Sequence, residues 1–294
     1  MLKTLSRAFA ALAMLLAPAA HAQASRDADP ALWVVKDRDT TIYLFGTIHA
    51  LKPGLAWFDE AVRAAFDRSD QLMLEMVEPD AATLQGLVVR MALNPTGPTV
   101  TEQLPEDKRA AYTAAMTAAG IAPAMYDRFD PWLPAVALTS ASLPKLGYDP
   151  NLGAEKTLTA AANAAHKPIG GLETAEQQLG YFDGLAPALQ VKYLVSTVDE
   201  LDQMGPQLDK MVGNWAAGDP DALAAAMNES VRETPELGKI LLSDRTARWA
   251  DWIEKRMADP GTVFIAVGAG HLAGPDSVQA FLAKRHIRAK RVRY

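Results

Sequence analysis

The chain has 294 residues, and its 35 acidic residues outnumber 29 basic ones to give a net charge of −6. An acidic balance of this kind argues against general binding of nucleic acid. The sequence contains no cysteine, which excludes a disulfide framework and a thiol nucleophile, so stability must come from the hydrophobic core. A chain of this length can bury such a core as one large domain or two closely joined ones.

The first 22 residues have the pattern of a secretory signal peptide. Lys3 and Arg7 precede an apolar stretch over residues 8–16, and the small residues that follow predict cleavage near Ala22-Gln23. The apolar stretch is shorter than the roughly 20 residues that span a bilayer. We therefore expect a periplasmic or secreted protein with no transmembrane segment after signal cleavage.

Apolar runs and helical patterns alternate along the rest of the chain. Two β-rich runs, 32–36 and 41–45, are joined by three charged residues and predict an N-terminal hairpin. Helical spacing follows over 57–66, and residues 71–77 have the apolar composition of a short strand. The further expected elements are mostly helix over 80–145 with interrupting prolines, a helix over 153–165, a strand over 167–172, a helical region from 174 to 257, a strand over 262–267, a helix over 276–284 and a strand over 287–293. Thr174 opens the helical region, and Gln177, three residues on, is in the position of a capping box.

This order of elements predicts an α/β fold, with a mixed β-sheet core flanked by helices and a helical lobe. We expect residues 23–294 to form a single domain. Its strand-bearing core would come from residues 31–79, 147–184 and 260–294, and its helical lobe from residues 80–146 and 185–258. The final strand is basic, which is typical of a charged edge that blocks sheet-to-sheet association. Contact with an anionic lipid or glycan is the alternative interpretation.

Four of the strand candidates lead into an imidazole or a carboxylate. His49 and His271 each follow a strand in a Gly-x-x-His pattern, and Glu75 and Glu173 end two others. In sheets flanked by helices, sites collect where the carboxyl ends of strands meet. Two imidazoles and two carboxylates would suit a divalent first-row metal ion. They would equally suit a His/Glu pair for acid–base catalysis.

Each of these residues also has a purely structural interpretation. His49 and His271 could be loop histidines bonded to the backbone, and Glu75 could be the polar member of a half-exposed strand. Glu173 precedes a helix start, where the helix dipole favours a carboxylate in any protein. Arg245 could be a surface helix residue, or else a clamp for a substrate carboxylate or a developing oxyanion.

Three motifs in this order resemble the TraB/GumN/Tiki family. They are Gly-Thr-Ile-His at 46–49, Gly-Leu-Glu-Thr at 171–174 and Val-Gly-Ala-Gly-His-Leu-Ala-Gly at 267–274. The family has paired Gly-x-x-His motifs with acidic residues, and some animal members are reported to be metal-dependent proteases. The resemblance covers almost the whole mature chain.

By this resemblance, His49 and His271 take the metal-binding positions, and Glu75 and Glu173 take the acidic ones. The family also tends to carry an Arg-Asn pair ahead of the last long strand. Here that place reads Arg245-Thr246, so the arginine fits and the threonine departs from the pattern.

The resemblance implies an exported, peptidase-like, metal-dependent hydrolase. Mn²⁺, Co²⁺ or Zn²⁺ would be held by the two histidines and at least one glutamate, and would lower the pKa of a bound water. The remaining glutamate would act as general base, and Arg245 would stabilise the oxyanion. The substrate would be a peptide or another small molecule with an amide or ester bond.

Two alternatives remain from the residues themselves. A metal-independent esterase-type hydrolase would use a histidine oriented by a glutamate to activate water. A non-catalytic periplasmic protein would bind a peptide or a polysaccharide. The sequence has no H-E-x-x-H, no G-x-S-x-G and no cysteine, so a standard zincin, α/β-hydrolase or thiol hydrolase is excluded.

Overall fold

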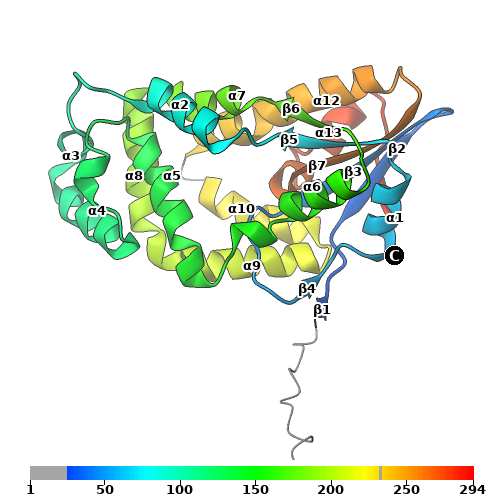
Figure 1. The fold of residues 1–294 in the computed structure, drawn as a ribbon, viewed down its shortest axis with the longest axis horizontal. Helices are drawn as coiled ribbons and strands as arrows, with labels where there is room; N and C mark the ends of the chain where they lie inside the picture. Colours follow the sequence, from blue (N-terminus) through cyan, green and yellow to red (C-terminus); the bar gives the residue numbers. More distant parts are fainter. Residues whose placement is uncertain (1–24, 232–233) are drawn as a thin grey trace, which may run out of the picture.

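A computed structural model describes residues 25–231 and 234–294, and the predicted signal peptide lies outside them. Its centre is a six-stranded sheet in the order β6-β5-β7-β3-β2-β8 (Figure 1). The strands are β2 (Leu32–Lys36), β3 (Thr40–Thr47), β5 (Gln71–Met76), β6 (Ile169–Glu173), β7 (Gly261–Gly268) and β8 (Lys290–Val292). A short parallel pair, β1 (Arg26–Asp27) with β4 (Leu55–Ala56), stands apart from this sheet.

The sheet is mixed, as predicted. Strands β6, β5, β7 and β3 are neighbours and run parallel, whereas β2 is antiparallel to both β3 and β8. The predicted hairpin is confirmed, because β2 and β3 pair from Leu32 opposite Phe45 to Lys36 opposite Thr41. The basic strand β8 lies at the end of the strand order, which agrees with its expected role as a charged edge.

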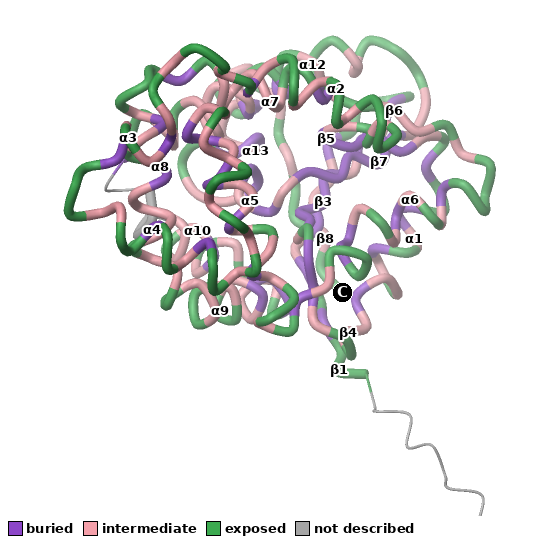
Figure 2. The backbone as a smooth tube through the Cα atoms, turned by 60° about the vertical axis from the view of Figure 1, so that its left-hand side comes forward, coloured by how far each residue is buried: buried purple, intermediate pink, exposed green. Residues whose placement is uncertain are grey.

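Helices cover both faces of the sheet, and alternate strand residues face opposite ways. Ile42 and Leu44 of β3 pack with α12 (Asp244–Arg256) and α13 (Val278–Lys284). Phe45, which points the other way, packs with α1 (Glu60–Arg68), α6 (Ala154–Ala164) and α9 (Met204–Ala216). In Figure 2 the central strands are coloured as buried along most of their length. The result is a three-layer α/β core.

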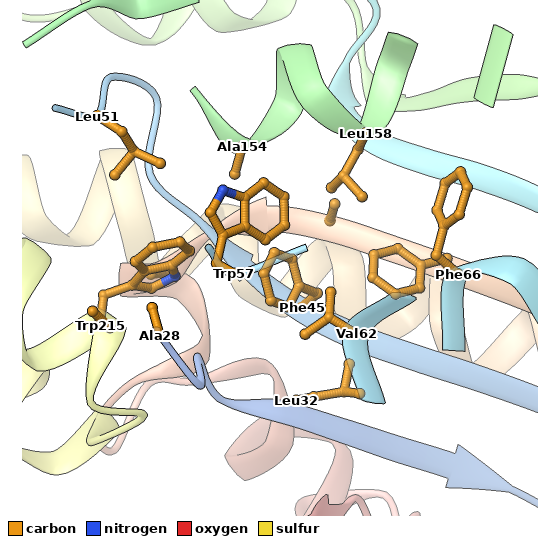
Figure 3. Packing of buried hydrophobic residues seen from close by; sticks show 14 of the residues in the cluster. Ala28, Leu32, Phe45, Leu51, Trp57, Val62, Phe66, Ala154, Leu158 and Trp215 are labelled. Carbon is orange, nitrogen blue, oxygen red and sulfur yellow. The ribbon is translucent and has the colours of Figure 1, made fainter. Parts of the chain in front are cut away.

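Aromatic rings fill the core on the α1, α6 and α9 side (Figure 3). The Phe45 ring lies 5.4 Å from that of Trp57, and Trp57 lies 5.9 Å from Trp215 of α9. The Trp215 indole also donates a 2.7 Å hydrogen bond to the carbonyl oxygen of Gly46. That bond ties α9 to the end of β3, two residues before the Ile48-His49 turn.

A second group of helices lies to the left of the sheet in Figure 1. Its members have a separate apolar cluster, built from α3 (Val100–Gln103), α4 (Glu106–Ala119), α5 (Trp132–Ser142) and α8 (Pro187–Asp199). The remaining helices are α2 (Ala81–Ala92), α7 (Ala175–Asp183), α10 (Pro220–Val231) and α11 (Pro235–Gly238). Because α9, α10 and α12 pack against the sheet, this cluster is smaller than the lobe predicted from the sequence, and the proposed domain division stays a prediction.

Among residues 25–231 and 234–294, no helix has both the length and the apolar character needed to cross a membrane.

Candidate active site

The parallel strands bring the four singled-out side chains to one edge of the sheet. Because β6, β5, β7 and β3 are adjacent and parallel, their carboxyl ends present Glu173, Glu75, His271 and His49 in that order. The two glutamates are buried near the ends of β6 and β5. His271 lies in the 3₁₀ turn Ala269–Leu272 directly after β7, and His49 is two residues beyond β3. Their assignment as site residues stays a prediction, but the fold does bring them together.

Arg245 reaches this edge from the first turn of α12 and binds both glutamates. Its Nη2 lies 2.6 Å from Glu75 Oε2 and 2.7 Å from Glu173 Oε2. Its Nε donates to both oxygens of Glu173 at 3.1 Å. Only 11% of the arginine side chain is exposed. The two carboxylates more than offset the effect of burial, so the pKa of Arg245 is raised and the group stays charged.

All five N–H groups of Arg245 are directed at protein acceptors. Besides the glutamates, Nη1 donates to the Leu241 carbonyl oxygen at 3.1 Å and lies 3.4 Å from His271 Nε2. The guanidinium carbon also lies over the rings of Tyr181 and Trp249, at 5.3 and 4.9 Å from their centroids. Since a guanidinium has five donors in a fixed plane, this geometry holds Arg245 in one orientation.

Helix α7 completes the surroundings of Glu173. The predicted capping box is confirmed, with the Thr174 hydroxyl accepting from Gln177 N–H and the Gln177 side chain accepting from Thr174 N–H. Helix α7, beginning at this point, places Tyr181 near the Glu173 carboxylate. The Tyr181 hydroxyl lies 2.9 Å from Glu173 Oε1. The Trp249 indole donates to the same oxygen at 3.2 Å. Glu173 is therefore a fully partnered buried carboxylate.

Glu75 is held as a carboxylate by its neighbours. Burial alone would raise its pKa, but His271, Arg245 and His49 and the Gly268 N–H lower the pKa to about 2. The Gly268 N–H donates to Oε1 at 2.6 Å. Glu75 therefore stays ionised across the physiological range.

His271 is buried and neutral. Its side chain is 4% exposed, and its ring packs 4.3 Å from the ring of Trp249. Nδ1 lies 2.8 Å from the Thr246 hydroxyl, and Nε2 lies 3.8 Å from Glu75 Oε1. Burial, which disfavours the imidazolium, lowers the pKa of His271 to about 4.

His49 has a different partner and is open to solvent. Its side chain is 73% exposed, and Nδ1 lies 2.6 Å from Oε1 of Glu155, near the start of α6. Bonding to this carboxylate is the main reason that the pKa of His49 is raised to about 9. The pKa of Glu155 is in turn lowered, since hydrogen bonding and charge from His49, together with Thr47, outweigh its burial.

Glu155 was missed by the sequence analysis. It lies far from His49 along the chain, and an acidic residue in the first turn of a helix has an ordinary explanation in the helix dipole. The contact depends on how α6 docks. Gly153 allows that docking, because a Cβ there would lie only 2.2 Å from the His49 carbonyl oxygen.

The three ionisable side chains nearest the sheet edge approach one another at Gly268. A Cβ at this glycine would lie 3.0 Å from Glu75 Oε1, 3.6 Å from His271 Cδ2 and 3.8 Å from His49 Nε2. The absence of a side chain at Gly268 therefore lets both imidazoles and one carboxylate come close together at this point.

The metal ion implied by the family resemblance does not fit this arrangement. Among the residues that the structure describes, no three His, Cys, Asp or Glu side chains form a group that could hold one. Arg245 already neutralises Glu75 and Glu173 and lies beside His271 Nε2. A divalent cation at these ligands would therefore meet a fixed positive charge. Metal binding stays a prediction, and it would require Arg245 to move.

The architecture and this edge define the class of the protein: an α/β protein with a buried Arg–Glu cluster and two histidines at the carboxyl ends of parallel strands. The sequence profile of the TraB/PrgY/gumN family matches residues 31–291. The chain therefore belongs to the TraB/PrgY/gumN family, which confirms the resemblance seen in its motifs.

The relatives carry no assigned function in their names. The chain is 24% identical over 253 residues to the uncharacterized protein YbaP of Escherichia coli strain K12, covering 86% of this chain and 92% of that protein. The same values hold for YbaP of Shigella flexneri. An uncharacterized protein of Treponema pallidum is 23% identical over 288 residues, covering 87% of this chain and 80% of its own length. No solved structure matches.

Proposed function

We propose that the protein is an exported hydrolase of amide or ester bonds, in which two histidines of opposite protonation state act on water and on the leaving group. The observation that supports this most directly is geometric. Both imidazoles are held through Nδ1 by different partners, and both lie close to Gly268, His271 through Cδ2 and His49 through Nε2. Groups whose surroundings push their pKa values apart are the usual acid and base of a site.

The histidines would divide the chemistry between them. When a water molecule replaces the long 3.4 Å contact between Arg245 Nη1 and His271 Nε2, neutral His271 takes one proton from that water, and the resulting hydroxide attacks the carbonyl carbon of the substrate. As the carbon–nitrogen or carbon–oxygen bond breaks, protonated His49 gives a proton to the leaving group. His271 then returns its proton to solvent and His49 regains one, so the cycle closes without a cofactor.

Arg245 has a supporting role in this proposal. The sequence analysis predicted that Arg245 stabilises the oxyanion, but none of its N–H groups is left for a substrate. We assign it instead to holding the side chains of Glu75 and Glu173 together. The negative charge of Glu75 next to His271 then favours the imidazolium that forms during proton transfer.

The proposal is tested on the mature protein, residues 23–294, with libraries of peptides and of small esters. Turnover in excess chelator, lost in His49→Gln and His271→Gln variants, is the expected result. Turnover that appears only after addition of Mn²⁺, Co²⁺ or Zn²⁺ would replace it with the metal-dependent hydrolase of the family resemblance. No turnover, with ligand binding retained in the double variant, would favour the peptide- or polysaccharide-binding protein.

A further inference from the structure

Thr246 is a completely buried residue that the proposed chemistry has not used. It follows Arg245 in the first turn of α12 and is 0% exposed. Its hydroxyl oxygen lies 2.8 Å from two groups, the Leu242 carbonyl oxygen and His271 Nδ1. A threonine hydroxyl has one hydrogen and two lone pairs, so the two contacts have to differ in direction.

The donor in each of the two contacts of the Thr246 hydroxyl follows from the hydrogens that are available. The Leu242 carbonyl can only accept, so it receives the one hydroxyl hydrogen of Thr246. His271 Nδ1, at the same distance from that oxygen, then has to be the donor. Both contacts are satisfied only when His271 carries its proton on Nδ1.

A second contact on the other side of the ring leads to the same assignment. Arg245 Nη1 lies 3.4 Å from His271 Nε2, and a guanidinium can only donate. Nε2 must therefore present a lone pair. Glu75 Oε1, at 3.8 Å, lies beyond hydrogen-bond distance and does not require a hydrogen on Nε2.

We propose that Thr246 is a positioning residue that holds His271 as the Nδ1–H tautomer, with the Nε2 lone pair on the side of Arg245 and Glu75. Packing against Trp249 and the fixed Arg245 keep the ring from rotating into the alternative arrangement. The catalytic consequence rests on the proposed function, because a base needs this lone pair. The tautomer itself does not, and it can be measured without any substrate.

The test is a two-bond ¹H–¹⁵N spectrum of the full mature protein labelled on its histidine rings, recorded at neutral pH. A His271→Gln spectrum assigns the resonances of His271 by their disappearance. Nε2 is the nitrogen that couples to both ring C–H protons. In the wild type it should have the chemical shift of an unprotonated nitrogen, and Nδ1 that of a protonated one. The reverse pattern, or two protonated nitrogens, would overturn the proposal.

Two variants separate positioning from packing. Thr246→Val keeps the shape but removes the hydroxyl, and should shift His271 toward the Nε2–H tautomer or a tautomer mixture. Thr246→Ser keeps the hydroxyl and should preserve the wild-type spectrum. Given a substrate, Thr246→Val should lower kcat about 100-fold or more with little change in KM, and serine should restore it to within a few-fold.

The tautomer measurements still test the proposal if a variant does not fold or if no hydrolase activity is found. An unchanged His271 spectrum in folded Thr246→Val would overturn the positioning role, whatever the enzyme activity. Should the valine variant not fold, the wild-type and serine spectra still decide the tautomer. A protein without any hydrolase activity would remove the proposed function but leave the tautomer measurement intact.

Discussion

His49 and His271 both follow a glycine at the end of a parallel strand, yet their side chains meet opposite surroundings. His49 is mostly exposed and paired with the carboxylate of Glu155. His271 is buried and contacts the neutral hydroxyl of Thr246. The charged partner raises the pKa of the first to about 9, and burial lowers the pKa of the second to about 4. One local motif can therefore hold either a protonated or a neutral imidazole, depending on which helix docks beside it.

Replacing either histidine of this pair should cause the largest loss of activity. We expect His271→Gln and His49→Gln each to lower kcat by about 10²–10⁴-fold, the usual contribution of a positioned acid or base. Steady-state kinetics on a hydrolysed substrate measure the effect. The same substitution at exposed His286 is the matched control and should leave kcat unchanged. Full activity in His49→Gln would remove the acid from the proposed pair.

A methyl group placed between the two histidines should be nearly as harmful. Gly268 has an ordinary backbone conformation, φ −49° and ψ 133°, so alanine fits the chain itself. Its Cβ would lie 3.0 Å from Glu75 Oε1, which forces a small displacement of the site. We expect Gly268→Ala to lower kcat about 100-fold while thermal unfolding changes little. Wild-type kinetics in this variant would show that the reaction does not depend on the close approach of His49, Glu75 and His271 at Gly268.

The dependence of activity on pH should report the two histidines separately. The reaction needs His271 deprotonated and His49 protonated, so kcat/KM should rise near pH 4 and fall near pH 9. Removing the charge with Glu155→Gln should return the His49 pKa toward 6.5 and move only the alkaline limb. On that basis activity would drop about 30-fold at pH 8 and less than about two-fold at pH 6. An alkaline limb that stays near pH 9 in this variant would contradict the role of Glu155.

A separate effect is expected on stability, and it should depend on pH in opposite directions for the two histidines. His271 has a lowered pKa in the folded protein, so its contribution is complete above pH 6.5 and is lost as pH falls toward 4. The free energy of unfolding that His271 contributes in this way is on the order of 3 kcal/mol. His49 has a raised pKa, so its contribution is complete below pH 6.5 and is lost as pH rises through 9. Because His49 is exposed, we expect no more than about 1 kcal/mol from it.

Urea unfolding at several pH values measures both terms. His271→Gln should weaken the pH dependence of the free energy of unfolding between pH 6.5 and 4. His49→Gln should weaken it between pH 6.5 and 9. Glu75, whose pKa is lowered to about 2, adds a loss below pH 4.5, and this loss should be smaller in both variants because each histidine helps to lower that pKa. Equal curves for the two variants would mean that the histidines have the same surroundings.

The strand ends were predictable from sequence because the signals that define them are local. Apolar runs marked β3, β5, β6 and β7, and the parallel arrangement of such runs predicts that their ends meet. Glu75, Glu173, His49 and His271 were found by this reasoning. The capping box at Thr174 was equally local, and it is confirmed.

The partners of those residues were not predictable, because they come from helices whose docking depends on tertiary packing. Glu155 and Tyr181 have ordinary places on helices α6 and α7, and nothing in their neighbours along the chain points to a histidine or a carboxylate. Thr246 was noticed only as a departure from the family pattern, although its hydroxyl contacts His271. The contacts of all five Arg245 donors, which leave none for an oxyanion, depend on the docking of α12 against β5 and β6 and have no local signal in the sequence.

The contact between Trp249 and His271 also provides an optical reporter. The two rings are 4.3 Å apart, and a protonated imidazole at this distance quenches indole emission, whereas a neutral one does so far less. The fluorescence of the protein should therefore dim as acid reaches His271, and Trp249→Phe should remove that part of the change. The protonation of His271 can then be followed by fluorescence alone, with no substrate and no label.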